Sequence, residues 1–217
     1  MPQSIRTTAL NRRQLLGATA AAGVALSAGP AAAAADDGSS DLTDKPDLTG
    51  KSVLITGCSS GFGNIGAKLY AELGAKVFAT MRNLPRAEGE ALAKVAKDDG
   101  LDITIIELDV LSEESVNKAV AEAERLNGGA LDVVINNAGI GTGAPVELQD
   151  IETMQLLFDT NVVGYQRVVR AALPKMRARK SGLIVNISSQ LGRVMVPGMG
   201  FYSSTKFAVE SMSEQLA

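Results

Sequence analysis

The feature that most constrains this chain is a short apolar run that leads directly into a glycine-punctuated turn and then into a helical pattern. Residues 52–56 are apolar and rich in β-branched side chains, and Gly57, Gly61 and Gly63 follow within the next seven positions. Residues 62–73 have helical spacing, and Gly74 suits the position just after a helix. A strand–turn–helix unit of this kind can hold a pyrophosphate at the helix N-terminus, although the same glycines could serve only a tight turn.

Short apolar segments alternate with helical ones along the rest of the chain. Further strands are expected at residues 76–80, 103–108, 131–135 and 183–187. Further helices are expected at residues 85–98, 113–126, 147–158, 161–179 and from 202 onward, with Pro85 in a first turn and Ser112 as an N-cap. Near-continuous apolar strands separated by helices indicate a parallel sheet covered on both faces. The expected fold class is α/β: a doubly wound Rossmann sheet in three layers.

Composition removes several kinds of chemistry. The 217 residues include no histidine and one cysteine, Cys58. Histidine bases, Ser-His-Asp hydrolysis, an intrachain disulfide and His- or Cys-based metal sites are therefore excluded, and no metal is expected. A net charge of −3 argues against a nucleic-acid partner. Acid–base chemistry is left to Tyr, Lys, Asp or Glu.

The first 35 residues differ from the rest. They carry Arg6, Arg12 and Arg13 but no acidic residue, followed by a small-residue stretch and an alanine run that ends at Ala35. This pattern predicts a secretory signal, and residues 11–17 (NRRQLLG) resemble the twin-arginine type. We expect export to the periplasm or the outside, with a disordered leader or a cytoplasmic protein as alternatives. A membrane anchor is disfavoured because the apolar stretch is short and closed by a proline. Residues 36–50 read as a polar linker.

Two residues near the end of the sequence, Tyr202 and Lys206, lie four positions apart. On a helix this spacing places both side chains on one face, where an ammonium favours the phenolate form of a tyrosine. A plainer interpretation also fits: a helix-surface pair at these positions, a turn cap at Ser189 and an N-cap at Asn161.

Together these motifs resemble the short-chain dehydrogenase/reductase family over residues 51–217. TGCSSGFG at 56–63 matches the family's TGxxxGxG, with Phe62 where isoleucine is more usual. Residues 136–139 match NNAG, and residues 202–206 match YxxxK, with Ser189 thirteen positions before the tyrosine. The elements occur in family order and spacing. The amino-acid sequence around these motifs is most similar to the branch that contains hydroxysteroid and retinol dehydrogenases.

The resemblance implies a nicotinamide-dependent oxidoreductase that transfers a hydride to or from a small alcohol or carbonyl substrate. Tyr202 would be the acid or base, and Ser189 would orient the substrate oxygen. Lys206 would also hold the nicotinamide ribose, and Asn161 would support a water that relays protons to it. The residues implied to contact the cofactor are Gly57, Ser59, Ser60, Gly61, Phe62, Gly63, Arg82, Asp109, Val110, Asn137, Ala138, Gly139, Tyr202 and Lys206.

The choice of cofactor depends on the end of the second expected strand. Met81 stands where NAD-preferring members of the family carry Asp, and Arg82 follows it. A guanidinium fits a 2′-phosphate, so NADP is expected ahead of NAD, unless Arg82 is only a solvated charge. Asp109 either contacts the adenine, as the resemblance suggests, or only caps the next turn. The apolar residues among 190–201 hint at an apolar substrate but also suit loop packing.

The family pattern continues beyond the last residue of this chain. Family members usually add a sixth strand, a substrate-covering helical segment and a seventh strand, whereas the sequence stops at Ala217. We therefore expect a fragment that lacks the last strands and leaves the fifth strand at an edge. The alternatives to a dehydrogenase are an inactive nucleotide-binding module and a lyase or epimerase on the same scaffold. The resemblance also implies a homo-oligomer of the full-length parent, through the helices at 161–179 and 202–217.

Overall fold

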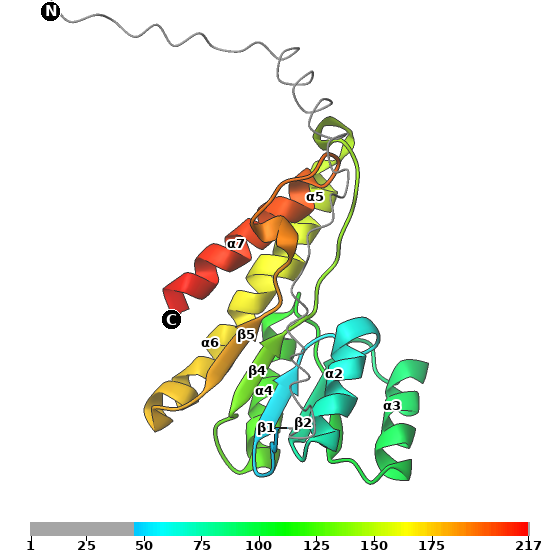
Figure 1. Cartoon of the computed structure of the whole chain (residues 1–217), viewed down its shortest axis with the longest axis vertical. Helices are drawn as coiled ribbons and strands as arrows, with labels where there is room; N and C mark the ends of the chain where they lie inside the picture. The colour runs from blue at the N-terminus through cyan, green and yellow to red at the C-terminus, as the bar shows by residue number, and fades with distance from the viewer. Residues whose placement is uncertain (1–45, 217) are drawn as a thin grey trace, which may run out of the picture. The chain divides into compact units, whose positions relative to one another are not determined.

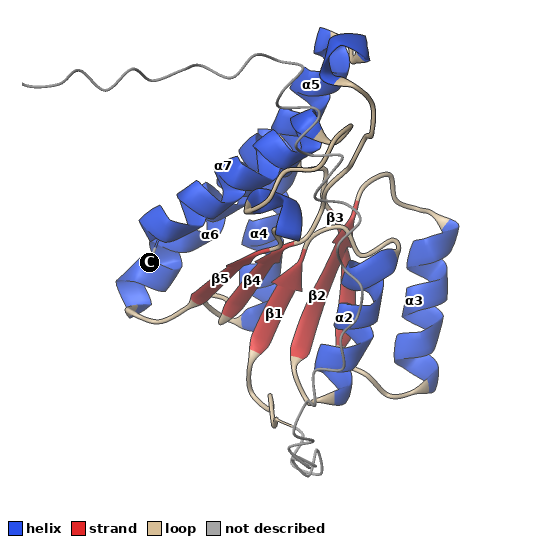
Figure 2. Cartoon of the chain, turned by 45° about the horizontal axis from the view of Figure 1, so that its top comes forward, coloured by secondary structure: helices blue, strands red, loops and turns tan. Residues whose placement is uncertain are grey.

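The order of the strands in the sheet defines the fold of this protein. The computed structural model describes residues 46–216. Its five parallel strands lie in the order β3-β2-β1-β4-β5 (Figure 2). Their bounds are β1 (Ser52–Ile55), β2 (Lys76–Met81), β3 (Ile103–Glu107), β4 (Val133–Asn136) and β5 (Leu183–Asn186). The chain builds outward from β1 to β3 and then crosses to β4 and β5. This confirms the doubly wound Rossmann sheet, whose ligand crevice lies where the strand order reverses, between β1 and β4.

Helices cover both faces of the sheet (Figures 1 and 2). On one face lie α2 (Gly61–Glu72) and α3 (Ala87–Asp98), and on the other lie α4 (Glu113–Asn127) and α6 (Gly164–Arg179). The last helix, α7 (Gly200–Leu216), follows β5. Four short elements complete the described chain: η1 (Val146–Leu148), α5 (Ile151–Phe158), η2 (Asp159–Val163) and η3 (Gln190–Gly192). The three-layer arrangement expected from the sequence is therefore present.

Alternating side chains of the strands divide the core in two. Leu54 of β1 is fully buried against α4 and α6, while its neighbours Val53 and Ile55 are buried against α2 and α3. Successive side chains of a strand point to opposite faces, so an apolar run without alternation is buried on both sides. The apolar strands that suggested a parallel sheet are thus explained by burial on both faces.

Three expected helices begin elsewhere than the sequence predicts. The helix expected at 147–158 is divided into η1 and α5, because Asp150 caps α5 by accepting from Thr153 N. Pro85 is not in the first turn of α3, which begins at Ala87 with Arg86 as its N-cap. The loop before α3 is held instead by Arg86, whose Nη1 donates to Arg82 O at 3.2 Å. Asn161 does not open a helix either. A π-helical turn, η2 (Asp159–Val163), joins α5 directly to α6, and Asn161 lies fully buried within it. By contrast, Ser112 is the N-cap expected for α4, and its Oγ accepts from Ser115 N at 3.2 Å.

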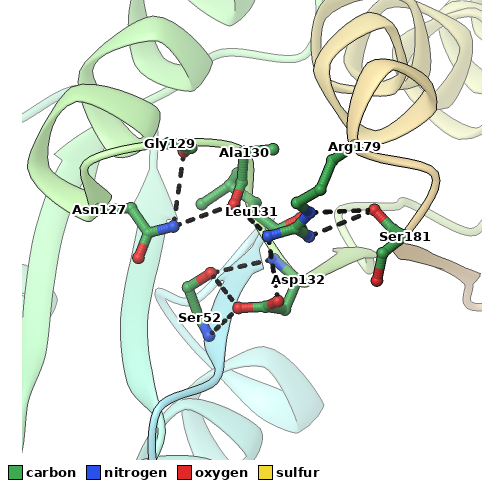
Figure 3. A network of polar contacts seen from close by, with 8 residues as sticks. All are labelled: Ser52, Asn127, Gly129, Ala130, Leu131, Asp132, Arg179 and Ser181. Carbon is green, nitrogen blue, oxygen red and sulfur yellow. Dashed lines mark hydrogen bonds and ion pairs between the residues drawn. The ribbon is translucent and has the colours of Figure 1, made fainter.

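A polar network ties together the amino ends of the strands (Figure 3). Asp132, just before β4, accepts hydrogen bonds from Ser52 N and Ser52 Oγ at 2.9 Å each. Arg179, the last residue of α6, forms an ion pair with Asp132 at 3.2 Å and donates to three backbone carbonyls, those of Ala130, Leu131 and Ser181. This network, which we call the amino-end clamp, fixes the end of the sheet opposite the carboxyl ends of the strands, where the glycine turn and residues 136–139 lie.

The expected signal peptide and most of the expected linker lie outside the described residues. The described part of that linker already contacts the fold, because Leu48 N donates to Leu73 O at 2.8 Å at the end of α2. Within residues 46–216, none of the helices combines the length and the apolar character needed to cross a bilayer.

Candidate active site

A cleft of about 490 Å³ opens at the carboxyl ends of the strands. Of the twelve positions expected to hold the cofactor besides Tyr202 and Lys206, the structure places eleven along its lining, and Gly63 alone lies beneath it. The lining contains Gly57, Ser59, Ser60, Gly61, Phe62, Arg82, Asp109, Val110, Asn137, Ala138 and Gly139. Segments that are far apart in the sequence therefore meet at one crevice, as the strand order requires.

The glycine turn is shaped by close backbone packing. Gly57 has φ +75°, and a Cβ there would lie 2.8 Å from Ala138 Cα. A Cβ on Gly63 would lie 2.4 Å from Gly57 O and 2.6 Å from Asn137 Nδ2. Both positions thus require glycine, the first for its backbone conformation and the second for space. The turn is pressed against the residues that follow β4.

The N-terminus of α2 suits a phosphate group. Ser60 is its N-cap but makes no side-chain capping hydrogen bond, and the first turn contains no acidic residue. The first N–H groups of a helix have no partner within the helix, and the helix dipole is positive at this end. Small residues and free N–H groups at this point fit the pyrophosphate of a dinucleotide.

Thr56, which was not among the expected site residues, joins the glycine turn to the end of β4. Its Oγ1 accepts from Asn137 N and from Ala138 N, both at 3.0 Å. Asn137 Nδ2 in turn donates to Thr56 O at 2.8 Å and to Gly57 O at 3.3 Å. The side chain of Asn137 therefore supports the wall of the cleft. Thr56 could have been found from the TGxxxGxG motif, of which it is the first residue.

The far end of the cleft carries two arginines. Arg82 is exposed there, as expected, and Arg86 lies beside it. Arg86 makes a two-pronged contact with Glu88, with both N–O distances at 2.9 Å, and these hydrogen bonds lower the pKa of Glu88 to about 2. The charge of Arg86 is thus balanced, while no ion pair of Arg82 is present among the described residues. Arg86 belongs to no recognisable motif, so sequence reasoning could not find it.

Asp109 caps the turn after β3, which is one of the two interpretations considered for it. Its Oδ1 accepts from Leu111 N at 3.0 Å. Asp109 also lines the cleft next to Val110. The capping contact holds the carboxylate region at the rim of the cleft.

Tyr202 and Lys206 lie one turn apart on α7, and the structure brings their side chains together. Lys206 Nζ is 5.7 Å from the centroid of the Tyr202 ring. Lys206 is only 4% exposed, and its Nζ donates to Ile187 O at 2.7 Å. Burial lowers the pKa of Lys206. A buried ammonium next to a phenol is the arrangement that favours the phenolate form.

Ser189 follows β5 and caps η3. Its Oγ accepts from Leu191 N at 3.2 Å, which leaves the hydroxyl proton available for a donated hydrogen bond. The short helix η3 packs closely on α7, because a Cβ on Gly192 would lie 3.0 Å from Lys206 O. The segment that carries Ser189 is therefore held against the helix that carries Tyr202 and Lys206.

The side chain of Asn161 is fully engaged with neighbouring segments. Its Oδ1 accepts from Ile140 N at 2.9 Å, and its Nδ2 donates to Ile140 O at 2.8 Å and to Thr205 Oγ1 at 3.1 Å. Asn161 thus links the loop after β4 to α7, next to Lys206.

Comparisons with known proteins agree with this geometry. A family model described as short chain dehydrogenase matches residues 51–217. Retinol dehydrogenase 8 of Bos taurus is 40% identical over 179 residues, which cover 77% of this chain and 53% of the relative. The 3-ketodihydrosphingosine reductase of Bacteroides thetaiotaomicron is 41% identical over 165 residues, which cover 76% of this chain and 56% of the relative. The chain thus spans about half the length of the curated relatives it matches.

Solved structures show the same fold. A gluconate 5-dehydrogenase from Burkholderia cenocepacia, in complex with NADP and tartrate, matches with a TM-score of 0.72 and 32% identity over 78% of this chain and 66% of its own. A short chain dehydrogenase/reductase from Burkholderia phymatum, in complex with NAD, matches with a TM-score of 0.72 and 28% identity over 79% of this chain and 60% of its own. Motifs, strand order, cleft and matched family model coincide over the same residues, and the chain belongs to the short-chain dehydrogenase/reductase family.

Proposed function

We propose that the protein is an NAD(P)-dependent oxidoreductase that interconverts an alcohol and a carbonyl compound. The observation that carries this proposal is the buried Lys206 ammonium beside Tyr202, on a helix that follows a dinucleotide-type cleft. Named dehydrogenases and reductases among the relatives support it, as do two solved relatives with NADP or NAD bound.

In this proposal Tyr202, Lys206 and Ser189 have separate chemical roles. The nicotinamide, when bound, supplies or accepts the hydride. Tyr202 gives a proton to the carbonyl oxygen in reduction, or takes one from the alcohol in oxidation. Lys206 stabilises the phenolate that Tyr202 becomes. The Ser189 hydroxyl donates a hydrogen bond to the substrate oxygen and so fixes the substrate in front of Tyr202.

We further propose that NADP is preferred over NAD. Met81 places no carboxylate at the end of β2, where an acidic side chain would hydrogen-bond a ribose 2′-hydroxyl. Arg82 lies exposed in the cleft and can pair with a 2′-phosphate. Asp109 and Val110 line the same end of the cleft and would border the adenine.

An apolar substrate is the third part of the proposal. The loop between η3 and α7 exposes apolar side chains, with Met195 at 71% and Val194 at 55%. This loop is bound to the segment before η1, because Ala144 N donates to Gly198 O at 2.7 Å. Exposed apolar residues on a loop that leads to Tyr202 favour a hydrophobic alcohol or carbonyl compound.

Two proposals concern the whole protein. The leader sequence favours export, which would require the cofactor to be loaded before transport; fractionation of cells that express the chain would test this. Recovery from the cytoplasm alone, with residues 1–35 retained, would contradict it.

Self-association of the full-length parent through α6 and α7 is also proposed, and the mass of that parent in solution tests it.

The first test of the function is a titration of the full chain with NADPH and, in parallel, with NADH. Binding is measured by the change in fluorescence of the nucleotide. We expect saturable binding that is tighter for NADPH. A panel of apolar ketones then tests turnover, with Tyr202→Phe as the control that should bind NADPH and lose turnover. Binding without any turnover in the unaltered protein would favour the inactive nucleotide-binding module. Binding of neither nucleotide would contradict the proposal for this chain.

A further inference from the structure

One backbone carbonyl next to the candidate catalytic residues accepts two hydrogen bonds. Ile187 O, just after β5, accepts from Lys206 Nζ at 2.7 Å and from Tyr165 Oη at 3.2 Å. Tyr165 lies in the first turn of α6 and is 1% exposed. The two donors come from α6 and α7, which run side by side in both views of the chain (Figures 1 and 2).

The rings of two tyrosines lie close to the same ammonium. Lys206 Nζ is 5.6 Å from the centroid of the Tyr165 ring and 5.7 Å from that of Tyr202. Both distances lie within the range of about 6 Å in which a cation is attracted to an aromatic face. Lys206 Nζ is therefore close to two aromatic rings, only one of which belongs to the YxxxK motif.

No carboxylate of the described residues forms an ion pair with Lys206. The strands β4 and β5 and the short helix η3 contain no ionisable side chain. The acidic groups on the helical elements around α7 are either paired elsewhere or exposed, namely Asp159 (paired with Arg167), Glu210 (paired with Arg193), Glu152 and Glu214. The Ile187 carbonyl and the two rings are thus what compensates the buried ammonium. Because a buried charge is costly unless it is compensated, loss of any one of these partners should change the position or the charge of the Lys206 ammonium.

Tyr165 and Tyr202 differ in their surroundings. Burial raises the pKa of Tyr165, and the proximity of Tyr202 raises it further. Tyr165 therefore remains a neutral hydroxyl that donates to Ile187 O, so it does not compete with Tyr202 for the role of acid or base.

We propose that Tyr165 is a positioning residue for Lys206: its ring and hydroxyl hold the ammonium at the Ile187 carbonyl, within reach of Tyr202. The inference rests on the proposed roles of Tyr202 and Lys206 and adds a residue that contacts neither substrate nor cofactor. A lysine carries its charge on a flexible four-carbon stem, so an ammonium that must act at a fixed place needs such a support. Without it, the charge would act on Tyr202 from a range of positions and would favour the phenolate less.

The composition of the chain makes this measurable without any cofactor. It has three tyrosines and no tryptophan, so the near-ultraviolet absorbance of tyrosinate reports few groups. A pH titration of the full chain gives the ionisation midpoints, and Tyr202→Phe identifies the one that belongs to Tyr202. Tyr165→Leu removes ring and hydroxyl, and Tyr165→Phe removes only the hydroxyl. Tyr70→Phe, on α2 and away from Lys206, is the matched control. Circular dichroism checks that each variant is folded.

We expect Tyr165→Leu to raise the Tyr202 midpoint by about one pH unit, a tenfold fall in the phenolate fraction at a given pH. Tyr165→Phe, which keeps the ring, should raise it by a smaller amount of about half a unit. Tyr70→Phe should leave it unchanged. A folded Tyr165→Leu with the midpoint of the unaltered protein overturns the inference. If the leucine variant does not fold, Tyr165→Phe decides, and an unchanged midpoint there overturns it.

Lys206→Met separates failure of this inference from failure of the proposed function. If Lys206→Met raises the Tyr202 midpoint while the Tyr165 variants leave it in place, only the role of Tyr165 is wrong. If Lys206→Met also leaves the midpoint in place, the charge of Lys206 does not act on Tyr202, and the proposed catalytic pair is wrong as well.

Discussion

Asn161 holds Ile140 at two points, with Oδ1 accepting from Ile140 N at 2.9 Å and Nδ2 donating to Ile140 O at 2.8 Å. The side-chain amide thus pairs with a peptide unit through one donor and one acceptor. Its second Nδ2 proton goes to Thr205 Oγ1 on α7. A single buried amide therefore fixes the distance between the loop after β4 and the helix of Tyr202 and Lys206. Only an amide side chain offers donor and acceptor in this geometry.

Asn161→Asp tests this bridge with a side chain of the same shape that cannot donate when ionised. We expect a loss of about 2–4 kcal/mol in the free energy of unfolding, because a buried charge is added and Ile140 O loses its donor. Urea denaturation measures it. The control is Asn127→Asp, which removes a comparable amide donor to Ala130 O at a less buried site and should cost about 1 kcal/mol or less. Equal losses in the two variants would contradict the bridging role.

Gly63→Ala tests the packing beneath the nucleotide cleft. The new Cβ would lie 2.4 Å from Gly57 O, so the glycine turn must move. We expect a loss of about 1–3 kcal/mol in stability and an NADPH affinity lower by about tenfold or more. Thermal denaturation and nucleotide titration measure the two effects. Gly129→Ala, where a Cβ meets nothing within 4 Å, should change neither quantity. An unaltered NADPH affinity in Gly63→Ala would show that the turn is not part of the site.

Arg82→Ala tests the choice between the two nicotinamide cofactors. We expect the Kd for NADPH to rise about tenfold and the Kd for NADH to stay within about twofold, because only NADPH offers a 2′-phosphate. Parallel fluorescence titrations measure both. Arg125→Ala, an exposed arginine paired with Glu122 and outside the cleft, serves as control. Equal weakening of both nucleotides would mean that Arg82 does not distinguish them.

Cys58 makes stability depend on alkaline pH. Burial raises the pKa of its thiol from 9.0 to about 12. Because the folded value lies above the unfolded one, the protonated thiol stabilises the fold fully below pH 9.0, and this contribution is lost as the pH rises toward about 12.

The matched variant for this effect is Cys58→Ala, which cannot ionise. Between pH of about 8 and about 10.5, the unaltered protein should lose about 2 kcal/mol more of its free energy of unfolding than the variant does. Urea denaturation at the two pH values measures the difference. Parallel losses in both proteins would mean that the Cys58 thiol is not shielded as the structure shows.

The sheet and the glycine turn could be predicted because short-range patterns determine them. Apolar runs such as 52–55 need burial on both faces, and Ser112 has the side chain that caps a helix. Motif positions such as Gly57 and Asn137 reached the cleft for the same reason, since they stand at the ends of strands.

Residues that depend on contacts between distant segments could not be predicted in this way. The π-helical turn at Asp159–Val163 arises where Asn161 turns inward to meet Ile140, twenty-one positions earlier in the chain. Arg86 reaches the cleft through a loop whose path no local pattern specifies. Tyr165 looks like an ordinary core residue until Ile187 and Lys206 are placed beside it.

The amino-end clamp of Ser52, Asp132 and Arg179 lies at the opposite end of the strands from the cleft. Substitutions at the amino ends of the strands can therefore adjust thermal stability, and substitutions at the carboxyl ends can adjust substrate choice. The effects of substitutions at such separated positions are expected to be additive. An engineer who strengthens the clamp should gain stability without retuning the chemistry. In a lineage under selection for a new substrate, the clamp should offset the loss in free energy of unfolding that accompanies changes in the loops.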